Sequence, residues 1–75
     1  MIAMRSENNP PYGAVIERGL VTETTASGCV VESCDRKGVV SPPIAGITNE
    51  VYSAGDRVFF FLFDDGDGLI IRKMS

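Results

Sequence analysis

The pattern of apolar and polar positions indicates strands rather than helices. No stretch places apolar residues at i, i+3, i+4 and i+7 over more than two helical turns. Val and Ile number 14 against 3 Leu, and β-branched side chains favour extended backbone. The 8 glycines recur mostly at intervals of about 6 to 11 residues, which is typical of short strands separated by turns. We therefore expect an all-β fold with little or no helix, in the form of a small antiparallel five-stranded barrel that is OB-like or SH3-like.

The beginning of the chain differs from the rest in its pattern. Residues 1–11 are mostly polar and end in Pro10 and Pro11, neither of which has an amide hydrogen to donate to a sheet. We therefore expect a flexible N-terminal arm over residues 1–11, which orders only on a neighbour. Residues 12–75 are expected to form a single β-barrel domain.

The first strand is expected over residues 12–21, where apolar and polar positions alternate. Ala14 and Ile16 fall on one face of this strand. Gly19 is suited to a bulge or tight bend that shifts the phase of the alternation. Residues 22–28 lack large apolar side chains and end in a Ser-Gly pair, which predicts a hairpin tip flanked by continuing strand.

Two further strands are expected around a polar turn. Residues 29–34 (CVVESC) form the second strand, and residues 35–38 (DRKG) are typical of a hairpin turn. The third strand is placed at residues 39–41. It ends there because Pro42 and Pro43 cannot donate to a strand ladder.

The last third of the chain contains the clearest hairpin. Residues 45–55 are interpreted as a connection, with a short strand at 50–53 or a single helical turn as alternatives. Residues 58–63 (VFFFLF) and 69–74 (LIIRKM) are rich in strand-forming residues. The Asp/Gly segment between them, residues 64–68, predicts the turn of the hairpin.

The strand over residues 58–63 is apolar on both faces. Alternation places its even-numbered side chains on one face and its odd-numbered side chains on the other. Because a barrel of this size has a single interior, the second face needs a cover. Another chain, the N-terminal arm, the curvature of the barrel or the connection at 45–55 could supply that cover, and a stacking platform for single-stranded nucleic acid is a further alternative. We expect subunit contacts at five aromatic side chains, namely Phe59, Phe61, Phe63, Tyr12 and Tyr52.

Length and charge limit the class of protein. A chain of 75 residues allows one small domain, and a domain of this size buries only about 60% of its unfolded surface. Stability is therefore marginal, which favours self-association. The formal charge of −3 disfavours nucleic acid as a partner, because phosphate binding needs a basic surface. The sequence offers no long apolar run and no signal-peptide pattern, so we expect a cytosolic protein, or one incorporated in an assembly, and no membrane partner.

The residues that carry chemistry are sparse. There is no His, and the sequence contains no arrangement of a nucleophile, a base and an orienting group, so we expect no enzyme activity and no catalytic residue. Cys29 and Cys34 lie about 16 Å apart if both are in a strand, which is too far for a disulfide, and zinc would need four N or S ligands. The Asp-rich tip at 64–68 lacks the ligand pattern of a calcium loop. We therefore predict no metal or other cofactor.

Two stretches resemble a known family. Residues 52–58 (YSAGDRV) followed by a hydrophobic strand, the DGDG tip at 65–68 and the final strand at 69–74 are similar to the end of phage tail and baseplate OB-type barrels. Residues 12–16 (YGAVI) resemble the first strand of the same group. The match covers about half of the chain. The tip departs from the pattern in having Phe-Asp-Asp where the group has a Pro, and the middle section is short.

The resemblance implies a non-catalytic structural protein of a phage or prophage tail or baseplate. Its expected partners are further copies of the chain, as a homo-oligomer, or other tail and baseplate proteins. The alternative is a small OB-like or SH3-like binding module for a ligand, a peptide or single-stranded nucleic acid. That alternative predicts salt-sensitive binding through five cationic side chains, namely Arg36, Lys37, Arg57, Arg72 and Lys73.

Overall fold

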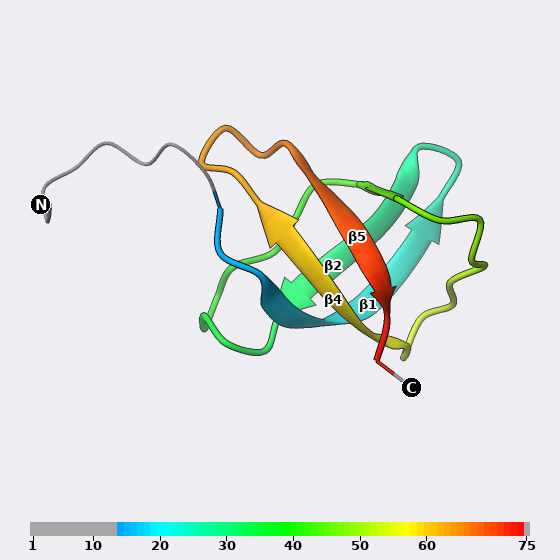
Figure 1. Ribbon diagram of the computed structural model, residues 1–75, viewed down its shortest axis with the longest axis horizontal. Coiled ribbons are helices and arrows are strands. Elements are labelled where there is room, and N and C mark those ends of the chain that lie inside the picture. Colours follow the sequence, from blue (N-terminus) through cyan, green and yellow to red (C-terminus); the bar gives the residue numbers. More distant parts are fainter. Residues whose placement is uncertain (1–13, 75) are drawn as a thin grey trace, which may run out of the picture.

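The computed structural model describes residues 14–74, and within that range the fold is all-β with no helix (Figure 1). The strands follow the order β2-β1-β4-β5-β3 in one sheet. The expected all-β fold with five strands is confirmed. The arm predicted over residues 1–11 lies outside the described residues. The strands are β1 (Glu17–Thr25), β2 (Gly28–Ser33), β3 (Ala45–Gly46), β4 (Arg57–Leu62) and β5 (Gly68–Lys73).

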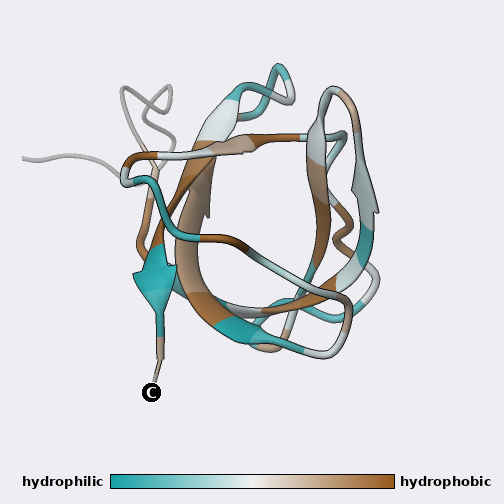
Figure 2. Cartoon of the chain, turned by 90° about the vertical axis from the view of Figure 1, so that its right-hand side faces the viewer, coloured by the Kyte–Doolittle hydropathy of each residue, from teal (hydrophilic) through white to brown (hydrophobic). Residues whose placement is uncertain are grey.

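The sheet curls round on itself, as the end-on view in Figure 2 shows. Its two outer members meet at an isolated bridge. The Cys29 amide donates to the Ile44 carbonyl at 2.8 Å, and the Ile44 amide returns a bond of 2.9 Å to the Cys29 carbonyl. This bridge joins β2 to the residue before β3. The neighbours around the sheet follow the order β1-β2-β3-β5-β4-β1, which makes the fold barrel-like. One detail of the expectation is wrong: β3 runs parallel to β5, so the barrel is mixed rather than wholly antiparallel.

Five side chains form the centre of the hydrophobic core. They are fully buried, and they come from β1, β2, β4 and β5, so the core joins all four long strands. In β4 the even-numbered side chains point inward and the odd-numbered side chains outward, which confirms the predicted two-faced strand. The five are Val21, Val31, Val58, Phe60 and Ile70.

Strand β1 differs from the prediction in its start, its phase and its bulge. It begins at Glu17 rather than at position 12, and it continues to Thr25. Its inward positions are Glu17, Gly19 and Val21, whereas Ile16 is exposed. The irregularity in its pairing with β2 lies between Val21 and Glu23, not at Gly19. Gly19 is instead needed for close packing, because a Cβ there would lie 2.7 Å from a ring carbon of Phe60.

The third strand lies elsewhere than predicted. At residues 39–41 the structure has a single bridge, from Val40 to Glu32. Strand β3 lies instead inside the segment 45–55, for which the sequence predicts a connection. The reason is visible at Ser41. Its amide donates to the Val31 carbonyl at 2.8 Å, but the Val31 amide donates to the Ser41 side-chain oxygen at 2.9 Å. A side-chain bond thus replaces one backbone bond of a ladder.

The C-terminal hairpin agrees with its prediction. Strands β4 and β5 pair antiparallel and are joined by the Asp/Gly turn, in which the Phe63 amide donates to the Asp67 carbonyl at 2.7 Å. Gly66 has φ 92°, a left-handed conformation that favours glycine. The two thiols are free, with Cys29 buried and Cys34 exposed.

Candidate functional site

The outward side chains of β4 form an aromatic row. Phe59 and Phe61 are half-buried and Phe63 is 37% exposed. The rings of Phe61 and Phe63 meet edge to face, with centroids 5.6 Å apart and an interplanar angle of 77°. The Arg72 guanidinium lies 5.5 Å from the centre of the Phe59 ring, where a cation is attracted by the aromatic face. The three predicted Phe residues therefore share one surface.

Neighbouring strands extend this row into a band across the barrel. Leu69 of β5 pairs with Phe61 and is 36% exposed. Ile16 immediately precedes β1 and is 64% exposed. Continuing the register in which Glu17 faces Phe60 places Ile16 level with Phe61. We call this band the outer apolar face, and it consists of Ile16, Phe59, Phe61, Phe63 and Leu69.

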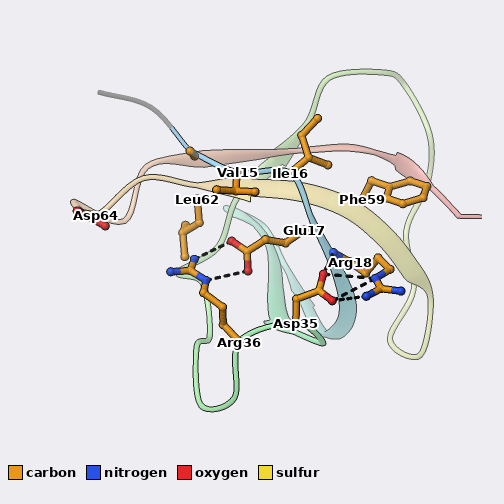
Figure 3. A pocket seen from close by; sticks show the side chains of 10 residues that line it. Val15, Ile16, Glu17, Arg18, Asp35, Arg36, Phe59, Leu62 and Asp64 are labelled. Atoms are coloured by element: carbon orange, nitrogen blue, oxygen red, sulfur yellow. Dashed lines mark hydrogen bonds and ion pairs between the residues drawn. The ribbon is translucent and has the colours of Figure 1, made fainter. Parts of the chain in front are cut away.

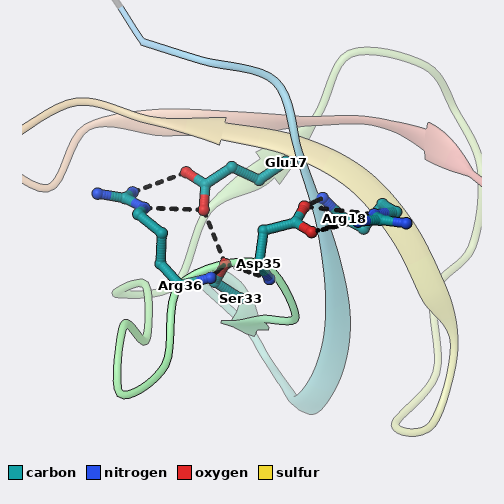
Figure 4. Close-up of polar contacts among 5 residues, drawn as sticks. All are labelled: Glu17, Arg18, Ser33, Asp35 and Arg36. Atoms are coloured by element: carbon teal, nitrogen blue, oxygen red, sulfur yellow. Dashed lines mark hydrogen bonds and ion pairs between the residues drawn. The ribbon is translucent and has the colours of Figure 1, made fainter.

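A second cluster lies at one end of the barrel, where Glu17 points inward (Figure 4). Arg36 holds its carboxylate with two bonds, from Nε to Oε1 at 3.0 Å and from Nη2 to Oε2 at 2.7 Å. The Ser33 hydroxyl donates to the same Oε1 at 2.7 Å. Glu17 is only 4% exposed. The hydrogen bonds from Arg36, helped by Ser33 and opposed by burial, lower the pKa of Glu17 below its ordinary value near 4.5.

Ser33 also anchors the turn that carries Arg36. Its side-chain oxygen accepts the amides of Asp35 at 3.1 Å and Arg36 at 2.9 Å. Beside it, the Asp35 carboxylate accepts bonds from the amide and the guanidinium of Arg18, and these bonds lower the pKa of Asp35. The two ion pairs fasten the segment after β2 to the start of β1. We call this arrangement the clamp, and it consists of Glu17, Arg18, Ser33, Asp35 and Arg36.

An open cavity of about 650 Å³ adjoins this clamp (Figure 3). Apolar side chains of residues 14–16, together with Phe59 and Leu62, form one part of its wall. The Glu17–Arg36 and Arg18–Asp35 pairs form much of the rest. The cavity therefore combines an apolar surface with carboxylates and guanidiniums that already neutralise one another.

Of the two other predicted contact residues, Tyr52 lies apart from the outer apolar face. Tyr12 is outside the described residues. Tyr52 packs against the core and against Gly46, and its hydroxyl donates to Glu50 Oε1 at 3.1 Å. Burial raises the pKa of Tyr52.

Sequence reasoning missed Ile16 and Leu69 as members of the face and Glu17 as a buried carboxylate. The alternation of β5 offered a signal for Leu69. The phase of β1 decides which side of the sheet Ile16 and Glu17 face, and that phase is ambiguous in the sequence.

Metal binding, membrane crossing and similarity to known proteins add no assignment to this geometry. Among residues 14–74, no three His, Cys, Asp or Glu side chains lie close enough together to hold a metal ion. The same residues contain no helix with the length and apolar character that a membrane crossing requires. Comparisons with protein-family models, with curated proteins and with solved structures found no match to this chain.

Proposed function

We propose that this chain is a non-catalytic structural protein that self-associates through its outer apolar face, as a component of a phage or prophage tail or baseplate. The observation that carries the association is the band of apolar side chains on the outside of a barrel whose interior is already filled. Exposed apolar bands of this kind are typical of protein–protein contacts. The tail or baseplate context rests on the sequence resemblance alone.

The chemistry of the buried carboxylate supports a non-catalytic role. A general acid or base at neutral pH needs a pKa near the working pH. The pKa of Glu17 is shifted in the opposite direction, and its two oxygens are held by Arg36 and Ser33. The side chain therefore acts as an anchor for the Ser33–Arg36 turn.

Substitution on the outer apolar face tests the proposal. Phe61→Asp places a charge in the middle of the face without touching the core, so we expect the full chain to change from an oligomer to a monomer in native mass spectrometry. Val51→Asp is the matched control, because Val51 is 79% exposed and belongs to the segment before β4, outside the face. Association that survives Phe61→Asp would contradict the proposal.

The cavity favours a second candidate, a binding module for a small ligand or a peptide. The variant of this candidate that binds single-stranded nucleic acid has less support. Two of its predicted cations are engaged by carboxylates: Arg36 by Glu17, and Lys73 by Asp56 at 3.6 Å. We expect no binding of short fluorescent single strands at low salt, and salt-sensitive binding would favour the module instead.

A further inference from the structure

The β4–β5 hairpin carries opposite charges at its two ends. Arg57 opens β4 and Arg72 lies near the end of β5, so both are at the base of the hairpin, and both are exposed. Asp65 and Asp67 are exposed in the turn at its tip. Phe61 and Leu69 of the outer apolar face pair with each other between these ends, whereas Phe59 pairs with Arg72 at the cationic end. Along the strand direction the surface therefore changes from cationic through apolar to anionic.

The spacing of these charges is symmetric about the middle of the hairpin. Three residues lead from Phe60 back to Arg57, and three lead forward to Phe63, whose amide bonds to Asp67. At a rise of about 3.3 Å per residue, the cation and the acid lie about 10 Å on either side of the centre. Alternation places Arg57 on the same side of β4 as Phe59 and Phe61.

We propose that the occupant of the outer apolar face is a second copy of this chain, packed face to face with its hairpin antiparallel to the first. A two-fold axis that runs across the strands brings Arg57 of each copy to Asp67 of the other. The same axis stacks the two aromatic rows, as in aligned packing of two sheets. A two-fold axis along the strands would instead bring the bases of the two hairpins together and the tips together, so that like charges would repel at both ends.

This arrangement rests on the proposed function, since it names the partner and the orientation at the same face. It makes the contact self-complementary, so association ends at a dimer through this surface. It also predicts that association weakens with added salt, because exposed ion pairs are screened.

Charge reversal in the full chain tests the orientation. Among the described residues, neither Arg57 nor Asp67 uses its side chain in a hydrogen bond or ion pair. We therefore expect Arg57→Glu and Asp67→Lys to leave the fold unchanged. Each single reversal places like charges at both contacts of the dimer. We expect each to weaken the dimer about tenfold in sedimentation equilibrium, and the double variant Arg57→Glu/Asp67→Lys to restore it.

Matched controls separate position from net charge. Lys37→Glu changes the net charge by the same amount as Arg57→Glu, and Glu23→Lys by the same amount as Asp67→Lys. Lys37 and Glu23 are exposed and lie outside the outer apolar face. We expect neither control to alter the dimer. If Phe61→Asp abolishes association while the charge reversals do not weaken it, the antiparallel orientation is wrong and the proposed function stands. A wild-type chain that is monomeric at all concentrations contradicts both.

Discussion

The carboxylate of Glu17 points inward at one end of the barrel. It is the only charged side chain among the buried residues of the described part of the chain, and Arg36 and Ser33 satisfy its oxygens. Taking a carboxylate out of water is costly unless it is paired and hydrogen-bonded. The ion pair at this residue therefore helps to hold the segment after β2 against β1, beside the bond of 2.8 Å from the Cys34 amide to the Arg18 carbonyl.

Glu17→Gln removes the charge while keeping the shape. We expect the free energy of unfolding to fall by about 1–3 kcal/mol at neutral pH, because Arg36 loses its ionic partner. Urea denaturation measures the change. Glu23→Gln is the control, since Glu23 is exposed. Equal stability of the two variants would contradict the clamp.

Because of the same clamp, the free energy of unfolding depends on pH in the acidic range. The folded pKa of Glu17 is lower than its ordinary value near 4.5, so the folded state binds this proton less readily than the unfolded state. The contribution is fully present above the ordinary pKa and disappears as the pH falls through the folded pKa. We expect the difference in unfolding free energy between the wild-type chain and Glu17→Gln to shrink across that acidic range. A constant difference would show that ionisation plays no part.

Gly19 tests how tightly the core is packed. An added Cβ would lie 2.7 Å from the fully buried ring of Phe60 and would also meet Val31. We expect Gly19→Ala to cost about 1–3 kcal/mol in thermal or urea unfolding. Adding Val31→Ala opens space beside position 19, so the double variant should be less destabilised than the sum of the two single variants. Strict additivity would contradict this close approach.

The sequence predicted the elements best where alternation and turn chemistry agree. In the β4–β5 hairpin both signals coincide, and the two faces of β4 were assigned correctly. The start of the chain offered two possible phases for β1, and only packing of Gly19 against Phe60 selects between them. The location of β3 depends on pairing with β2 and β5, which are distant in sequence, so local pattern could not reveal it.

Ser41 shows why the segment after β2 failed to form the predicted strand. Its hydroxyl oxygen takes the Val31 amide in a buried bond. We expect Ser41→Ala to leave that amide without a partner, to cost about 1–3 kcal/mol and to accelerate hydrogen exchange at Val31. Ser27→Ala, in the exposed β1–β2 turn, is the control. Unchanged exchange at Val31 would show that another group satisfies it.

At the scale of the whole molecule, the barrel has a filled interior and also carries an apolar band, the outer apolar face, on its outside. The candidate face was predicted in part, since Phe59, Phe61 and Phe63 follow from strand alternation alone. Ile16 and Leu69 complete it only once β1 and β5 are placed beside β4. Because a domain of this size buries a limited share of its surface, we expect the proposed contact between copies to add to its stability.

Sedimentation velocity of the wild-type full chain over a range of concentrations tests the central claim most directly. We expect the weight-average mass to rise from that of one 8.1 kDa chain to that of a dimer as the concentration reaches tens of micromolar. A mass that remains at one chain throughout that range would contradict the assignment of the outer apolar face as a contact between copies.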